Sequence, residues 1–502
     1  MTTKEKNEQR QTPYLDAYSK YLKEQTTVFD VPGHHQGKIR TDFDHIFGHI
    51  VYKNDVNCPR GMDNLLHPTG AIKEAQELFA KACHADFCKF LVNGSTSGNL
   101  IMIMSAVKAN EKIIMPRNVH KSAINALILS GAKPVFIMPE VDKATEIVNQ
   151  PTFKQWKEAI DQNLDAKAIF IINPTYFGAT CDLKKVVKYA HQHNIVVLVD
   201  EAHGTHFYFS KKLPITAMDA GADMATLSIH KTGGSLTQSS ALLLKGNRVT
   251  MYEVTKSFNL ITTTSPSSIL LASLDAARKF LVFKGSRHIY NAIKLARQAK
   301  ERIDKIPGFI AHSKDYFLTN CDAYGYDETK LCVEIDKLAI SGFDLYKILK
   351  DKYRVQIELA ETYVFLLLFT IGSEQKDVDR IVEALTEISN MYYDPSITYQ
   401  ENKHFIDGFP QMKIRPRVAF HAPLKVSKLD DAINKISKEM IMIYPPGIPI
   451  IVPGEVFTRQ VIDEIEYYSK IKATILSDWN NVNEVSVVDE DNWDYYKDDA
   501  QE

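Results

Sequence analysis

The chain has 502 residues, and its 60 Lys and Arg nearly balance 62 Asp and Glu, which leaves a formal net charge of −2 at pH 7. This balance excludes a general attraction to nucleic acid or to an anionic membrane. The length predicts about two or three domains. No apolar run approaches the roughly 18 residues of a membrane helix, and residues 1–11 lack a signal peptide's apolar core. Six scattered Cys indicate free thiols in a reducing cytoplasm.

The N-terminal part, residues 1–70, reads as an arm followed by two loops. Helical spacing of apolar residues predicts a helix around residues 14–22. The loop Phe29–Gly37 then presents His34 and His35 between Pro and Gly residues. No carboxylate or Cys completes a metal-ligand set close to these histidines, so a cleft-lining role is favoured. Cys83, His84 and Cys88 also lack a second pair of ligands, and no metal site is expected.

From residue 71 short apolar strands alternate with helices, which is typical of a mostly parallel sheet covered on both faces. This predicts an α/β domain over residues 71–285. The expected strands are 87–92, 112–115, 134–138, 168–172, 195–199, 224–228 and 241–244. The expected helices are 71–83, 100–107, 120–130, 153–163 and 183–192.

The C-terminal part changes character. Residues 286–400 predict an α+β domain with strands at 331–335, 355–359 and 363–369 and helices at 288–305, 343–350 and 377–391. A further lobe, 401–475, contains a helix at 456–471. The polar, acidic tail, 476–502, is expected to be mobile and dispensable from Asp478 onward.

Four polar clusters follow predicted strands: residues 93–99, 118–122, 200–203 and 228–231. Ligands bind at the carboxyl ends of the strands in open parallel sheets. These clusters therefore predict one ligand site at that edge of the sheet.

Each cluster can be interpreted either as an ordinary structural feature or as part of a ligand site. Lys231 follows a buried strand, and burial favours the neutral amine that a Schiff-base lysine needs, although a lone Lys in a Gly-rich loop is usually a surface charge. Asp200 ends an apolar strand, where a carboxylate needs a cation such as a protonated pyridine nitrogen, or else caps a local turn. Ser95, Thr96 and Ser97 precede an apolar helix and offer donors to a phosphate, or simply cap the helix.

Taken together, these clusters describe a pyridoxal phosphate site. His120 could stack on the cofactor ring, although a single His is more often structural. Ala202 is small enough to lie under the ring, and His203 could stay hydrogen-bonded within the same turn. Ser228 and His230 could join the phosphate cradle.

The chain also resembles a known family, the bacterial ornithine/lysine/arginine decarboxylases, fold-type I pyridoxal phosphate enzymes, in their short form. The resemblance runs in order from about residue 30 to 470. The matching stretches are Val31–His34, Asn93–Asn99, Arg117-Asn118 with His120–Ser122, Asn173–Tyr176 with Gly178, Asp200–Gly204, Ser228–Thr232 with Leu236–Gln238, Tyr444–Pro449 and Pro453–Glu455.

The resemblance implies roles for these residues. Lys231 would hold the cofactor covalently, Asp200 would pair with its pyridine nitrogen, and His120 would stack on its ring. It also implies a fold-type I architecture with a seven-stranded sheet and a phosphate held by Ser95, Thr96, Ser97, Ser228 and His230. The loop Thr263–Ser267 would help complete the partner subunit's site, so a homodimer is expected. Glu455 would face the cationic end of the substrate.

The activity implied is decarboxylation of a basic amino acid, with arginine favoured over lysine or ornithine, feeding polyamine synthesis or acid resistance. The family commonly has Lys where this chain has His35. Too few residues precede the phosphate turn for the wing domain of longer members, so a wing-mediated decamer is not expected. An aminotransferase, which grips the α-carboxylate with an Arg such as Arg415 or Arg417, and a non-catalytic relative of the fold stay open as alternatives.

Overall fold

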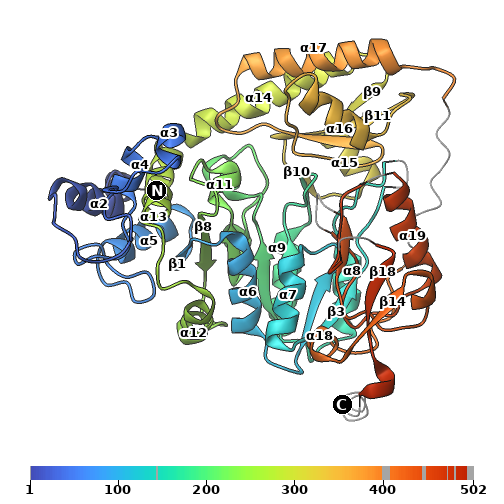
Figure 1. The fold of residues 1–502 in the computed structure, drawn as a ribbon, viewed down its shortest axis with the longest axis horizontal. Coiled ribbons are helices and arrows are strands. Elements are labelled where there is room, and N and C mark those ends of the chain that lie inside the picture. Colours follow the sequence, from blue (N-terminus) through green and yellow to red (C-terminus); the bar gives the residue numbers. More distant parts are fainter. Residues whose placement is uncertain are drawn as a thin grey trace. The chain divides into compact units, whose positions relative to one another are not determined.

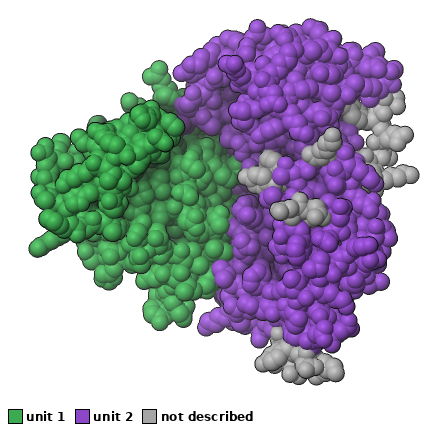
Figure 2. Space-filling view, in the orientation of Figure 1, with its two compact units in different colours: residues 1–105, 198–290 green, residues 106–197, 291–502 purple. Residues whose placement is uncertain are grey.

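The computed structural model describes residues 2–142, 145–397, 408–443, 448–471, 473–479 and 482–493. Figure 1 traces the order of the elements along the chain. Two compact units divide it, and they are coloured separately in Figure 2. Unit 1 comprises Met1–Ser105 and Leu198–Tyr290, and unit 2 comprises Ala106–Val197 and Asn291–Glu502.

The central feature is a seven-stranded sheet with the order β1-β8-β7-β6-β4-β2-β3. The pairs β2–β3, β2–β4 and β6–β7 are parallel, whereas β8 is antiparallel to both β1 and β7. The mostly parallel, seven-stranded sheet expected from the sequence is therefore confirmed. Its strands are β1 (Phe87–Leu91), β2 (Lys112–Pro116), β3 (Lys133–Ile137), β4 (Ala168–Ile172), β6 (Val196–Asp200), β7 (Met224–Leu227) and β8 (Ser240–Leu244).

The strands form where the sequence has short apolar runs, and most of their residues are buried because helices cover the sheet, although the edge strand β3 is mostly half-buried. The helices of this part are α5 (Ala71–Ala82), α6 (Gly94–Ala106), α7 (Lys121–Ser130), α8 (Phe153–Asp161), α9 (Leu183–Gln192), α10 (Ala217–Ala220), α11 (Ile229–Thr232), α12 (Met251–Ile261) and α13 (Ser268–Phe280), with a short 3-10 turn at Thr205–Phe209. A π-helical turn, Leu281–Gly285, joins α13 to α14 (Ser286–Ile303).

One helix begins earlier than the sequence predicts. We expected a loop over residues 93–99 and a helix from Leu100, but α6 starts at Gly94. The hydroxyl of Ser97 donates to the Gly94 carbonyl oxygen over 2.8 Å, and the left-handed φ of +67° at Gly94 turns the chain directly into the helix. The Ser and Thr residues of this segment therefore belong to the first turn of α6.

The N-terminal arm contains α1 (Thr3–Glu8), α2 (Pro13–Lys23), α3 (Phe43–Phe47) and α4 (Ile50–Asn54). A fully buried Arg278 on α13 secures it by donating to the Gln9 carbonyl oxygen and to Asp275, each over 2.9 Å. Asp275 in turn accepts from the backbone N–H of Tyr14 over 3.0 Å. These buried hydrogen bonds fix the arm to the body of unit 1.

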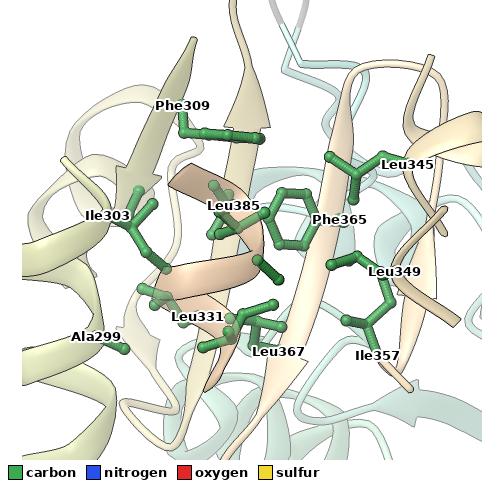
Figure 3. Packing of buried hydrophobic residues seen from close by; sticks show 14 of the residues in the cluster. Ala299, Ile303, Phe309, Leu331, Leu345, Leu349, Ile357, Phe365, Leu367 and Leu385 are labelled. Carbon is green, nitrogen blue, oxygen red and sulfur yellow. The ribbon is translucent and has the colours of Figure 1, made fainter. Parts of the chain in front are cut away.

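In unit 2 an antiparallel sheet with the order β12-β13-β11-β9 packs against helices. Its strands are β9 (Phe309–His312), β11 (Lys330–Ile335), β12 (Leu359–Ala360) and β13 (Val364–Leu368); β5 (Ala179–Thr180) pairs with β10 (Gly325–Tyr326). The helices are α15 (Lys314–Asn320), α16 (Gly342–Asp351) and α17 (Gln375–Tyr392). Figure 3 shows the shared core, in which Phe365 and Leu367 of β13 meet Leu385 of α17. The predicted strand at 355–359 is wrong over most of its length, since only Leu359 is paired.

The C-terminal lobe contains α18 (Pro416–His421), α19 (Arg459–Lys470), β14 (Leu424–Lys428), β15 (Ile441–Ile443), β16 (Ile448–Ile451), β17 (Ile475–Leu476) and β18 (Glu484–Val488), with 3-10 turns at Asp430–Ala432 and Glu490–Asn492. The prediction of a mobile tail is wrong for β18, which pairs with β14 and buries Val485 and Val487. The valines of this short strand alternate with polar residues, and the acidic surroundings masked that pattern. Tyr444–Gly447 of the sequence motif and residues 494–502 of the tail lie outside the described residues.

Helices long and apolar enough to cross a membrane do not occur in the part of the chain that the structure describes. The proposed boundaries at residues 70, 285, 400 and 475 stay predictions.

Candidate active site

Two serine hydroxyls meet at the start of α6. Ser95 Oγ lies 2.7 Å from the Oγ of Ser228, a residue that follows β7 and immediately precedes α11. The helix lies directly on the strand, because a Cβ at Gly98 would stand 2.0 Å from Thr226 Oγ1. The first-turn N–H groups of a helix carry partial positive charge and bind phosphate. Ser95, Thr96 and Ser97 share that turn, and their binding of a phosphate stays a prediction.

Asp200 ends β6 and is only 6% exposed. Its Oδ2 accepts from Asn99 Nδ2 over 2.7 Å, and its Oδ1 accepts from the backbone N–H of Ala202 over 3.1 Å. Two donors from different segments fix the direction of this carboxylate. A buried carboxylate held in this way is a suitable partner for a protonated ring nitrogen.

Asn99 is the residue that the sequence reasoning missed. It belongs to a quoted motif, but no role was assigned to it. A usable signal was present: Asn99 lies four positions after Ser95, which places both on one face of a helix if the helix starts at Gly94. The expected loop over 93–99 hid this relation.

Lys231 lies on α11, and its Nζ is 3.0 Å from Nε2 of the buried His203. The neighbouring His230 points elsewhere, with Nδ1 3.0 Å from the Ser239 carbonyl oxygen. Burial, together with the charge of Lys231, lowers the pKa of His230. A phosphate would oppose this shift, because a nearby anion favours the charged imidazole.

His120 belongs to unit 2, whereas the other predicted cofactor residues belong to unit 1. It is the N-cap of α7: its Nδ1 accepts from the backbone N–H of Ser122 over 3.2 Å and lies 2.8 Å from the Ser122 hydroxyl. These contacts fix the orientation of the ring. Its stacking on a cofactor stays a prediction from the resemblance.

The arrangement in unit 1 fits pyridoxal phosphate. Ser95, Ser228 and the start of α6 provide phosphate donors, Asp200 provides the carboxylate for the ring nitrogen, and Lys231 provides the amine. Clusters of His, Cys, Asp and Glu that could hold a metal ion do not occur among the residues that the structure describes. Near the N-terminus, His34 Nε2 lies 3.2 Å from Asp55, and His35 has a left-handed φ of +52°.

Glu455 has a different setting from the one the sequence suggested. In unit 2 it is fully buried, and its two carboxylate oxygens accept from Arg117 Nε and Nη2 over 3.0 and 2.8 Å. Arg117 also donates to the carbonyl oxygen of Pro449 over 2.9 Å. Both charges are thus paired inside the protein, and a direct contact of Glu455 with substrate stays a prediction.

The Arg117–Glu455 pair yields a stability prediction. Arg117→Ala is expected to lower the free energy of unfolding by about 3–5 kcal/mol, because it leaves a fully buried carboxylate without its cation. Urea unfolding followed by circular dichroism measures this change. The matched control is Arg459→Ala, whose ion pairs with Asp430 and Asp463 are exposed and should contribute less than about 1 kcal/mol. Equal losses in both variants would contradict the assignment.

The aminotransferase alternative needs an arginine for the substrate carboxylate. Arg417 is already engaged, because its Nε donates to the Ile128 carbonyl oxygen over 2.9 Å and its NH2 donates to that of Leu129. Arg415 is the residue at the N-cap of α18. Arg417 therefore holds α18 against the end of α7 through these hydrogen bonds.

Fold and site together define a pyridoxal phosphate-dependent enzyme of fold type I. Residues 12–377 match the family description "Orn/Lys/Arg decarboxylase, major domain", and residues 399–476 match "Orn/Lys/Arg decarboxylase, C-terminal domain". The chain belongs to the Orn/Lys/Arg decarboxylase family, whose members decarboxylate basic amino acids with pyridoxal phosphate. The family membership inferred from the motifs is confirmed.

Individual relatives agree with the short form. An arginine decarboxylase of Bacillus subtilis (strain 168) is 40% identical over 91% of this chain and 93% of that protein. One from Halalkalibacterium halodurans is 41% identical over 90% of this chain and 92% of that protein. A Francisella novicida lysine decarboxylase structure aligns with a TM-score of 0.82 and 20% identity, covering 95% of this chain and 81% of that one. This last likeness shows the shared fold.

Proposed function

We propose that this protein decarboxylates L-arginine to agmatine and carbon dioxide. The observation that carries the chemistry is the grouping of Asp200, Lys231 and Ser95 with their partners at the strand ends of unit 1. The choice of arginine is supported by four arginine decarboxylases that are 38–41% identical over at least 90% of the chain. Its amine product would enter polyamine synthesis or serve acid resistance.

When bound, pyridoxal phosphate supplies an electron-withdrawing ring that accepts the electron pair released as the substrate carboxylate leaves. Ser95, Ser228 and the first turn of α6 would hold its phosphate. Asp200, kept in place by Asn99 and Ala202, would hold a proton on the ring nitrogen.

Lys231 is placed to move a proton to or from the substrate. Its Nζ lies 3.0 Å from His203 Nε2, so the two nitrogens can share or pass a proton along this contact. After carbon dioxide leaves, the substrate carbon must receive a proton, and Lys231 and His120 are the candidate donors. Decarboxylation also requires a carboxylate that is poorly solvated, which a site at buried strand ends provides.

The substrate prediction is tested by kcat/KM on arginine, lysine and ornithine, with the amine products separated by chromatography. We expect arginine to exceed the other two by about a hundredfold, because a site built for a guanidinium leaves buried groups unpaired with an ammonium. Preference for lysine would refute the proposed substrate but not the family. Activity on none of the three would refute the proposed function.

We also propose a homodimer in which the loop Thr263–Ser267 completes the partner's site. Thr263, Thr264 and Ser265 are exposed in unit 1, and the arm carries large exposed apolar side chains, among them Phe29 at 95% and Ile46 at 77%. Exposed apolar surface of this kind marks interfaces. The six free cysteines support a cytoplasmic location.

The dimer makes a sharp prediction for mixed subunits. Lys231→Ala, and a triple Ala variant of Thr263, Thr264 and Ser265, should each have little activity alone. Mixing them should restore about a quarter of the wild-type rate, because half of random dimers are mixed and each would hold one intact site. No recovery after subunit exchange, verified by sedimentation of tagged subunits, would show that the loop serves its own subunit.

A further inference from the structure

A pocket in unit 2 is lined by none of the residues that would hold the cofactor. It encloses about 980 Å³, including its open mouth. Arg117 and Asn118, which follow β2, and Met138 and Pro139, which follow β3, form one side of it. It therefore lies at the carboxyl ends of two parallel strands, the edge at which sheets of this kind bind ligands.

Three carboxylates reach this pocket from separate segments. Glu146 lies in the connection between β3 and α8, Glu361 in the turn between β12 and β13, and Glu464 on α19. The Oε2 atom of Glu464 is buried without a hydrogen-bond partner among the described residues. A buried acceptor left in this state is costly, and a ligand that donates to it would remove the cost.

Burial also changes the acidity of these groups. Burial, with a smaller contribution from the charge of Glu146, raises the pKa of both Glu361 and Glu464 to about 8, although Arg117 opposes the shift at Glu464. Neither group is therefore fully ionised at neutral pH. A cation placed among them would favour their charged forms.

The protein supplies little positive charge of its own to this pocket. Arg117 is the single Lys or Arg among the described residues that line it, and both oxygens of Glu455 accept from its guanidinium. The remaining wall is mostly apolar, with Val141, Val148 and Phe409, and Tyr467 and Tyr468 complete it. Such a wall suits methylene groups, and aromatic faces suit cations.

We propose that this acidic pocket binds a dicationic alkyl amine of the agmatine type and rejects the parent amino acid. Agmatine and arginine share the guanidinium and the methylene chain, but arginine adds an α-carboxylate. An amine bound between Glu361 and Glu464 favours their charged forms, and these would repel that carboxylate. Arg117 is not available to receive it because Glu455 occupies it. The naming of agmatine rests on the proposed function, whereas the preference for an amine without a carboxylate follows from the pocket alone.

The test is calorimetry on the full-length holoenzyme after borohydride reduction of the link between Lys231 and the cofactor. Neither ligand then reacts, so agmatine and arginine can be titrated side by side. We expect agmatine to bind at least about tenfold more tightly than arginine. Glu464→Gln and Glu361→Gln should each weaken agmatine binding at least about fivefold. Glu466→Gln, which alters an exposed pair with Lys470 on the same helix, should leave it unchanged.

The pH dependence of agmatine binding is a second measurement, and it reports the ionisation of Glu361 and Glu464. The titratable groups that face the pocket are Arg117 with Glu455, the three carboxylates Glu146, Glu361 and Glu464, and the phenols Tyr467 and Tyr468. Since the pKa of Glu361 and Glu464 is about 8, agmatine must displace protons, and its affinity should rise from pH 6.5 to 8.5. The binding enthalpy at pH 7 should depend on the buffer.

Equal affinity for arginine and agmatine, or unchanged agmatine binding in both Gln variants, would overturn this assignment. Each Gln variant replaces a neutral acid with an amide of the same shape, and thermal melts of the two check the fold. Turnover of arginine by the native enzyme without agmatine binding would sink this inference alone. Agmatine binding without turnover of any basic amino acid would sink the proposed function alone.

Discussion

Lys231→Ala should lower kcat for arginine by about a thousandfold or more, because it removes the amine that would hold the cofactor and that the substrate amine would replace. The loss should be in kcat rather than in folding. Lys231 lies on a short helix, α11, and its Nζ contacts the His203 side chain.

Two measurements check this expectation. Steady-state decarboxylation gives the rate, and absorption spectroscopy reports whether the cofactor is still linked covalently to the protein. The control is Lys211→Ala, which alters an exposed lysine of the same unit and should change neither. A Lys231→Ala protein with more than about a tenth of the wild-type rate would show that another amine does the work.

Asp200→Asn is the second large effect that we expect. Its kcat should fall about a hundredfold, or about 2.7 kcal/mol, because an amide cannot keep the ring nitrogen protonated. The substitution keeps the size of the side chain but places an amide opposite the donor of Asn99. Binding of the cofactor phosphate should change little, since Ser95 and Ser228 form a separate group.

The measurement is kcat together with the cofactor's absorption spectrum across pH. The matched control is Asp219→Asn, an exposed carboxylate of unit 1 that pairs with His84. Asn99→Ala should show a smaller loss in kcat and a shifted spectrum, because Asn99 positions Asp200 through its hydrogen bond. A normal spectrum and rate in Asp200→Asn would refute the role given to this carboxylate.

The sheet could be predicted because its strands are short, apolar and separated by helices. The predicted edges of β2, β4 and β7 agree with the structure to within one residue, and β4, Ala168–Ile172, agrees at both ends. Polar residues at the ends of such strands then indicated Asp200 and Lys231 as candidates. Local patterns of this kind are sufficient for the elements and for single residues.

Relations between distant residues could not be predicted in this way. Arg117 and Glu455 are 338 residues apart, and no local pattern connects them. Asn99 meets Asp200 only because α6 starts at Gly94, and the start of a helix is the least certain part of a prediction. The strand β18 was not predicted because the acidic residues around it masked the alternation of its valines with polar residues.

Decarboxylation of arginine with no exchange of its amino group is the central proposal for this protein. The most direct measurement is carbon NMR of the holoenzyme with arginine labelled at the carboxyl carbon. The account predicts that the label appears as carbon dioxide and bicarbonate while one agmatine forms for each label released. A labelled keto acid, or a carboxyl label that stays in the amino acid, would contradict it.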